Sequence, residues 1–164
     1  MKKITKYSLY GLIYLILIFF LAIMFIVTAK ADLIKPNNGI EPYQVVKIQL
    51  KSLMNNDDPK KNYGIEQTWK FAHPNNQKYT GPLEKFIVML KGQSYKMLLN
   101  HLEHKIVEVR LTDSFASYEV TVLDENKTYY KFNWQVERYE KEGALKDCWL
   151  TTMVSSPISL GSSI

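Results

Sequence analysis

The sequence predicts an α+β domain that follows an N-terminal transmembrane helix. An uncharged apolar run over residues 7–29 is long enough for a membrane span. Apolar residues then recur at helical spacing up to about residue 101, and from Ile106 their period changes from 3.6 to 2. Helices that precede strands with one apolar face predict an antiparallel sheet covered on one side by helices.

Residues 1–31 are predicted to form a membrane anchor or a signal sequence. The 23 residues of 7–29 would rise about 34 Å as a helix, enough for the roughly 30 Å of a hydrocarbon core. Ala29-Lys30-Ala31 has the small-x-small form of a signal-peptidase site, so cleavage after Ala31 is the alternative. Signal sequences usually have a shorter apolar region, which favours the uncleaved anchor. We expect membrane lipid to surround residues 7–29.

The basic residues on either side of the run predict its orientation. Lys2, Lys3 and Lys6 precede it, whereas Lys30 and Lys35 follow it. Positive charge concentrates on the cytoplasmic side of membrane helices. The N-terminus is therefore expected in the cytoplasm or stroma. The C-terminal domain is expected on the opposite side, in the periplasm or lumen, where a membrane protein is a candidate partner.

The composition argues against a nucleic-acid partner and against stabilisation by a disulfide. Four of the 21 basic residues and none of the 16 acidic residues precede Asp32, so the chain from Asp32 onward has a net charge of +1. A domain so balanced offers no basic surface for nucleic acid, and we expect no nucleic-acid partner. Cys148 is the single cysteine, so packing rather than an intramolecular disulfide must stabilise the domain.

Residues 32–40 read as a polar linker, and the α+β domain is predicted over residues 41–154. Helices are expected over residues 41–54, over residues 64–72, from Thr80-Gly81-Pro82 to Gly92, and as a short turn over residues 95–101. Strands with alternating apolar residues follow at residues 106–112, 116–122, 130–136 and 148–154. The Ser- and Gly-containing residues 155–164 are predicted to be a flexible tail.

Several segments of this domain occur in a familiar order. They are Val45-Val46-x-x-Gln49-Leu50, Phe71-Ala72-x-Pro74-x-Asn76, Thr80-Gly81-Pro82-x-x-x-Phe86, Tyr95-x-x-Leu98-Leu99-x-His101, Trp134-x-x-x-Arg138 and Cys148-Trp149-x-Thr151. Over residues 41–154 the combination resembles a domain family of bacteria, cyanobacteria and plants that is similar to nuclear transport factor 2-like proteins. The resemblance implies a cone of helices around a curved antiparallel sheet, and it implies no activity. His73 departs from the pattern, because a small residue is expected there.

A pocket between sheet and helices is the first candidate site, because such cones commonly leave a cavity at the open end. Its expected lining is aromatic: Trp69, Phe86, Tyr118, Tyr130, Phe132 and Trp134. An aromatic stripe at this spacing is more often part of a packed core than the lining of a ligand site. A general acid or base would have to come from His101, His104, Glu108, Tyr118 or Tyr130, and the sequence pairs none of them.

His101 and His104 stand three residues apart and would share one face of a helix. A zinc site would need a third ligand, and His73 is separated from the pair by two expected elements. We therefore expect no metal site and no cofactor. The sequence predicts a membrane-tethered, non-enzymatic interaction or ligand-binding module, with an accessory subunit of a membrane complex as one form. The alternative is a small-molecule enzyme that uses pocket tyrosines or histidines for proton transfer.

Overall fold

The computed structural model describes residue 11, residues 14–18 and residues 32–162. The chain divides after Asp32 into two units. In the first unit residues 11 and 14–18 are helical, and residues 14–18 rise about 7.5 Å as a helix, against the roughly 30 Å of a bilayer core. The rest of the run over residues 7–29, and the candidate cleavage point after Ala31, lie outside the described residues.

The predicted transmembrane helix is corrected by this structure. Within the described part of the chain, no helix combines the length and the apolar character that crossing a bilayer requires. The predicted location, with the N-terminus on one side of a membrane and the C-terminal domain on the other, depended on that helix. It is corrected with it.

The second unit begins with four α-helices and a short 3-10 turn. They are α2 (Pro42–Met54), α3 (Tyr63–Lys70), α4 (Pro74–Thr80), α5 (Leu83–Lys91) and η1 (Lys96–Leu98). Helix α2 starts where the sequence predicts, because Pro42 occupies its first turn and Glu41 and Gln44 form a capping box. Helix α4 was not expected. Pro74 reads as the end of the preceding helix, but it also opens the next one.

Helices α2 and α3 approach each other closely at Gly64. A Cβ atom at that position would lie 2.0 Å from the carbonyl oxygen of Ser52 in α2. The Gly64 N–H donates to the carbonyl oxygen of Asn56, and the Asn56 side chain accepts from the N–H of Ile65. A residue without a side chain therefore lets the start of α3 hydrogen-bond to Asn56 in the turn that follows α2.

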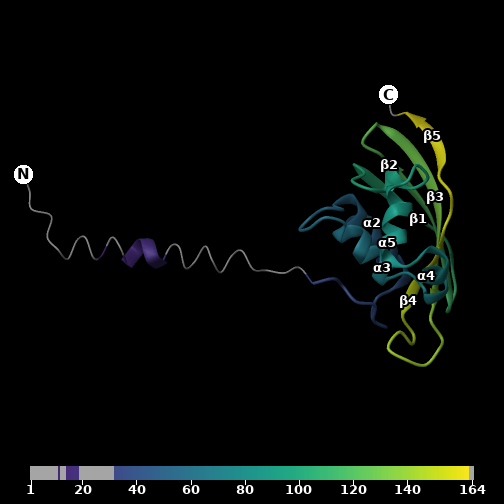
Figure 1. Ribbon diagram of the computed structural model, residues 1–164. Helices are drawn as coiled ribbons and strands as arrows, with labels where there is room; N and C mark the ends of the chain where they lie inside the picture. The colour runs from purple at the N-terminus through teal and green to yellow at the C-terminus, as the bar shows by residue number, and fades with distance from the viewer. Residues whose placement is uncertain (1–10, 12–13, 19–31, 163–164) are drawn as a thin grey trace, which may run out of the picture. The chain divides into compact units, whose positions relative to one another are not determined.

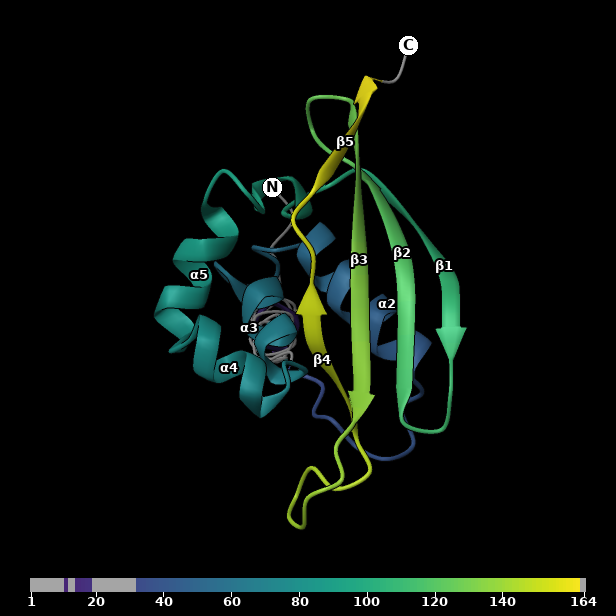
Figure 2. The same cartoon turned by 90° about the vertical axis from the view of Figure 1, so that its right-hand side faces the viewer.

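Five antiparallel strands follow the helices. They are β1 (Glu103–Leu111), β2 (Phe115–Leu123), β3 (Thr128–Arg138), β4 (Trp149–Val154) and β5 (Ile158–Ser162). The strand order is β1-β2-β3-β4, and β5 also pairs with β3. Because β3 is 11 residues long, β4 occupies one end of its second edge and β5 occupies the other (Figure 2).

The helices pack on one face of this sheet (Figure 1). Along β2 the buried residues alternate with partly exposed ones, and Ala116, Tyr118, Val120 and Val122 point into the core as the period of two predicts. Val45, Val46 and Leu50 of α2 lie in the same core. The α+β class and the antiparallel sheet thus agree with the sequence.

Two further segments differ from the sequence prediction. Residues 155–164 are expected to be a flexible tail, yet Ile158–Ser162 form β5 against the first residues of β3. His101 lies between η1 and β1 rather than in a helical turn, and His104 already belongs to β1. The sheet therefore begins three residues before the change of period at Ile106.

Candidate functional site

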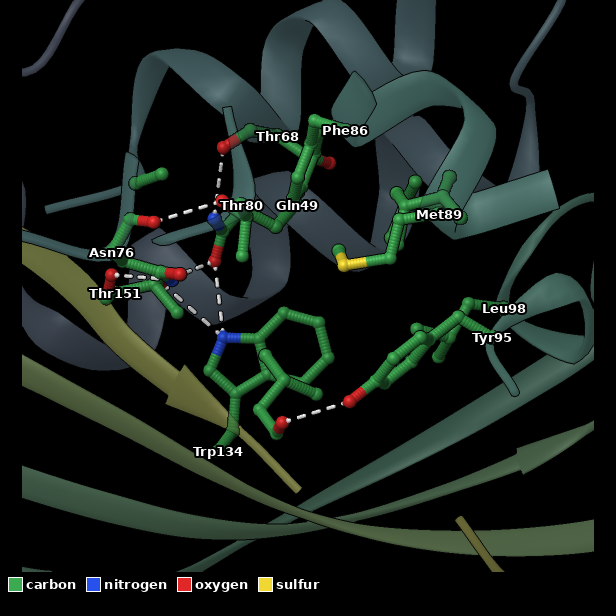
Figure 3. Close-up of a pocket in the computed structure, with 14 residues that line it drawn as sticks. Gln49, Thr68, Asn76, Thr80, Phe86, Met89, Tyr95, Leu98, Trp134 and Thr151 are labelled. Atoms are coloured by element: carbon green, nitrogen blue, oxygen red, sulfur yellow. Dashed lines mark hydrogen bonds between the residues drawn. The ribbon is translucent and has the colours of Figure 1, made fainter. Parts of the chain in front are cut away.

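A cavity of about 80 Å³ lies between the helices and the sheet of the second unit (Figure 3). It is lined by residues from α2 to η1 on one side and from β3 and β4 on the other. The lining consists of Gln49, Leu53, Thr68, Ala72, Asn76, Thr80, Phe86, Met89, Leu90, Tyr95, Leu98, Trp134, Thr151 and Val154. Most of this surface is apolar, and its polar side chains concentrate on one side.

That polar side is centred on Gln49, which α2 carries into the core. The Gln49 side-chain oxygen accepts from Nε1 of Trp134 at 3.1 Å and from the hydroxyl of Thr151 at 2.6 Å. The Gln49 side-chain nitrogen donates to the carbonyl oxygen of Thr68 at 3.1 Å. Gln49, Trp134 and Thr151 are each at most 2% exposed. Their polar atoms are therefore paired with one another, as buried polar groups require.

Met89 and Tyr95 form the opposite side of the cavity (Figure 3), and Phe86 also lines it. The Tyr95 hydroxyl donates to the carbonyl oxygen of Val154 at 3.4 Å, near the upper limit for a hydrogen bond. Since this bond is long and therefore weak, the hydroxyl loses little free energy when it leaves Val154 to form a shorter hydrogen bond with another group. Met89 has a flexible, polarizable side chain that adapts to the shape of a bound group.

Electrostatics limit what the cavity can do. No described residue of its lining is an Asp, Glu, Lys, Arg or His. Tyr95 carries the one phenolic hydroxyl of the described lining, which can donate or accept a hydrogen bond. The arrangement is suited to holding an uncharged molecule. It offers no acid and base pair for moving protons near neutral pH.

Of the six aromatic residues predicted for the pocket, Phe86 and Trp134 line the cavity. Trp69 lies behind the lining and packs on Phe86, with the ring centroids 4.9 Å apart. Phe132 is fully buried in the core, and Tyr130 is a partly buried residue packed against that core. The aromatic pattern thus contains both cavity-lining and core residues, and periodicity alone does not distinguish the two.

Tyr118 is buried in the core beside Tyr43, with the two rings edge to face and their centroids 6.1 Å apart. Its hydroxyl has no hydrogen-bond partner within the described part of the chain. Burial raises the pKa of Tyr118 to about 12, and the charge of Glu108, its neighbour across β1 and β2, contributes in the same direction. An acid this weak is poorly matched to proton transfer at neutral pH.

His101 and His104 are brought together, although they do not share a helix. Nδ1 of His101 lies 2.7 Å from the carbonyl oxygen of Leu98, and Nε2 of His101 lies 2.8 Å from Nδ1 of His104. A carbonyl oxygen only accepts, so His101 carries its proton on Nδ1. Its Nε2 then accepts from the Nδ1–H of His104. In this series of hydrogen bonds, Nε2 of neutral His104 remains available as an acceptor.

Both rings favour the neutral form. Burial lowers the pKa of His101 to about 4, against the opposing effect of the Leu98 carbonyl. Burial also lowers the pKa of His104, and the charge of Lys47 in α2 adds to that shift. His73 is elsewhere, edge-on to Tyr139 with the centroids 5.4 Å apart. In the described ranges, no cluster of three or more His, Cys, Asp and Glu side chains is placed to hold a metal ion.

The sequence prediction missed Gln49, Thr151, Met89 and Tyr95 as site residues. For Gln49 a signal existed, because it is a polar residue inside the apolar face of α2, between Val46 and Leu53. A buried polar residue on a helix needs a hydrogen-bond partner, so its presence indicates further polar groups nearby in the core. Thr151, Met89 and Tyr95 carry no comparable signal, since their roles depend on how the helices pack on the sheet.

The fold and the cavity together define an α+β domain with a mainly apolar, uncharged chamber between its layers. No protein-family model, curated protein or solved structure matches the chain. The similarity to nuclear transport factor 2-like proteins, suggested by the sequence motifs, therefore stays a prediction.

Proposed function

We propose that the domain is a non-enzymatic binding module whose cavity holds a small uncharged molecule. The observation that carries this proposal is the lining itself, which is mainly apolar and free of charged side chains over its described residues. Transfer of a charged group into such surroundings is costly unless an opposite charge meets it. Transfer of an apolar group is favourable, by roughly 25 cal/mol per Å² removed from water.

The polar cluster around Gln49 supports the same proposal. Gln49, Trp134 and Thr151 satisfy one another through hydrogen bonds within the protein. A cluster that is already paired stabilises the chamber and does not require a polar ligand group. Tyr95, with its long hydrogen bond to Val154, is the side chain best placed to accept or donate one bond to a ligand.

Cavity size limits the ligand further. The volume of about 80 Å³ is smaller than the roughly 150 Å³ cavity that encloses a benzene molecule in an engineered protein. It is also well below the 300 to 1,000 Å³ typical of sites for larger ligands. We therefore expect a short alkyl group to enter, with the polar end of the ligand held in the cavity beside the Tyr95 hydroxyl.

Titration with 1-hexanol and hexanoate at pH 7, followed by the indole N–H resonance of Trp134, tests the proposal. The two compounds share an alkyl chain and differ in charge. We expect hexanol to shift the Trp134 signal in a saturable manner and hexanoate to bind at least about tenfold more weakly, because its carboxylate must lose water. Equal binding of both, or no saturable shift with hexanol, contradicts the proposal.

Two variants on α5 provide a matched pair for this titration. Met89 lines the cavity, whereas its neighbour Val88 is 72% exposed and does not. Met89→Trp should fill the cavity and abolish the hexanol-dependent shift. Val88→Trp adds the same side chain to the same helix and should leave binding unchanged. Loss of binding in both variants would show that hexanol acts elsewhere.

A proton-transfer enzyme is the second candidate function, favoured by the hydrogen-bonded chain from Leu98 through His101 to His104. In such an enzyme His101 would be a positioning residue and His104 the base. Incubation with a mixture of small metabolites, monitored by NMR, tests it: turnover by the wild type that disappears in His104→Gln supports the enzyme. Absence of turnover, or turnover unchanged in His104→Gln, rejects this role for His104.

A further inference from the structure

Strand β1 (Glu103–Leu111) forms an edge of the sheet. Among the described strands it pairs with β2 alone, and Figure 2 shows it as the outermost strand. Its other side therefore presents backbone N–H and C=O groups that can pair with a further strand. Three of its aliphatic side chains are also exposed: Val107 at 43%, Val109 at 66% and Leu111 at 52%.

Charges of both signs alternate along this edge. The strand carries Glu103, Lys105, Glu108 and Arg110, with a bulge between Glu108 and Arg110 that leaves Val109 without a cross-strand partner. Because of the bulge, Arg110 lies on the same face as Glu103. Their β2 partners, Ser117 and Leu123, are six residues apart and so share one face of the sheet.

We propose that β1 pairs antiparallel with β1 of a second copy of this chain, around a two-fold axis at Ile106. Val109 lies in the bulge and is left out of the pairing in both strands. Each remaining residue then pairs with a residue whose side chain lies on the same face of the sheet. Glu103 stands opposite Arg110 of the second copy, and His104 opposite Glu108. Lys105 stands opposite Val107, and Ile106 opposite Ile106.

Charge complementarity selects this register over its neighbours. An alternative register must still pair residues whose side chains lie on the same face of the sheet, so only certain shifts are allowed. One such step moves the axis to Val107 and places Lys105 opposite Arg110. The step in the other direction places Lys105 opposite Lys105 of the second copy. Like charges directly opposite each other are destabilising, whereas the Ile106 register places no two like charges opposite each other.

The existing contacts of Glu103 and Arg110 are compatible with this pairing. One carboxylate oxygen of Glu103 accepts from the Tyr129 hydroxyl at 2.8 Å, which leaves its second oxygen for Arg110. The Arg110 guanidinium lies over the Phe115 ring, 5.7 Å from its centroid, and all of its N–H groups remain donors. Since a single strand from each copy forms the contact, the interface is small and we expect a weak dimer in the micromolar range.

Sedimentation velocity of the full chain over a concentration series tests the dimer. We expect a monomer–dimer equilibrium for the wild type. Either Glu103→Arg or Arg110→Glu should weaken dimerisation at least about tenfold, because each creates like-charge pairs. The double variant carrying both changes should restore dimerisation, since it exchanges the two charges. Lys85→Glu, an equal change of charge at an exposed position of α5, should have no effect.

A wild-type chain that stays monomeric up to millimolar concentration overturns the proposal. So does a double variant that dimerises no better than the two single variants. Circular dichroism must show that each variant is folded. If a charge reversal prevents folding, Val107→Lys replaces it: this exposed position then faces Lys105 of the second copy, and unchanged dimerisation in this variant counts against the Ile106 register.

Discussion

Gln49 of α2 and Trp134 of β3 are joined across the domain by a 3.1 Å hydrogen bond from the indole Nε1 to the side-chain oxygen. The residues are 85 positions apart in the chain, and the hydroxyl of Thr151 in β4 bonds to both. A helix and two strands are therefore tied at one point, on the polar side of the cavity. This arrangement fixes the indole ring that lines the chamber.

Replacement of Gln49 by Leu should destabilise the domain. The change removes the main acceptor of the Trp134 N–H and leaves it with the longer 3.3 Å contact to Thr151. The Thr151 hydroxyl also loses its acceptor on Gln49, and an unsatisfied buried donor costs about 1 to 3 kcal/mol, which the added apolar side chain does not offset. Urea denaturation measures the change, with Lys51→Leu on the exposed side of α2 as the control. An equal loss in both variants would assign the effect to helix α2 in general.

The sheet could be predicted from the sequence because its signal is local. Along β2 an apolar residue recurs at every second position, and Ala116, Tyr118, Val120 and Val122 do point into the core. Strand β5 could not be predicted in this way. Its residues include Ser and Gly and are exposed, and it forms because β3 extends beyond β4 and offers an unpaired edge.

The cavity was only partly predictable for a similar reason. Phe86 and Trp134 were expected in the lining and are found there, but Trp69 and Phe132 have the same aromatic character and lie outside it. Which aromatic residue lines a chamber depends on where helices end and how they pack on the sheet. The membrane helix predicted over residues 7–29 is a different kind of failure. That prediction used hydropathy alone, and none of the described helices is long and apolar enough to cross a membrane.

Gly64→Ala should destabilise the domain through a steric clash. The added methyl group would lie 2.0 Å from the Ser52 carbonyl oxygen, which belongs to the backbone of α2 and cannot turn aside. Overpacking of this kind typically costs about 1 to 3 kcal/mol, and the backbone contact places this case near the upper end. Thermal unfolding by circular dichroism measures it. Gly39→Ala, where the nearest atom is the Asn37 side-chain oxygen at 3.3 Å, is the matched control and should change stability little.

Stability should decrease as the pH is lowered from 6.5 towards 4. His101 has a folded-state pKa of about 4, against about 6.5 in an unfolded chain. Between these values the unfolded chain binds a proton that the folded protein does not, so acidification favours unfolding. The loss should approach about 1.4 kcal/mol per pH unit within this window and level off below it. The lowered pKa of His104 contributes in the same direction.

A pH series of urea denaturation curves for the wild type and His101→Asn checks this dependence. Asparagine keeps a donor near the position of Nδ1, so the bond to the Leu98 carbonyl can be retained while the titrating ring is removed. The variant should be less stable at pH 7 and should depend less on pH between 6.5 and 4. An identical pH dependence in both proteins would assign the effect to other groups.

Cys148 should react slowly with thiol reagents in the folded protein. Its side chain is buried, with 2% exposure, and burial together with the charge of Asp147 raises the pKa of its thiol. The reactive thiolate is therefore both scarce and inaccessible near neutral pH. Labelling with iodoacetamide at pH 8, followed by mass spectrometry, should be much slower in buffer than in urea above the unfolding midpoint. Because the chain has one cysteine, a single mass increase reports on this site alone. Equally fast labelling in the two conditions would mean that the strand that begins at Trp149 opens readily from β3.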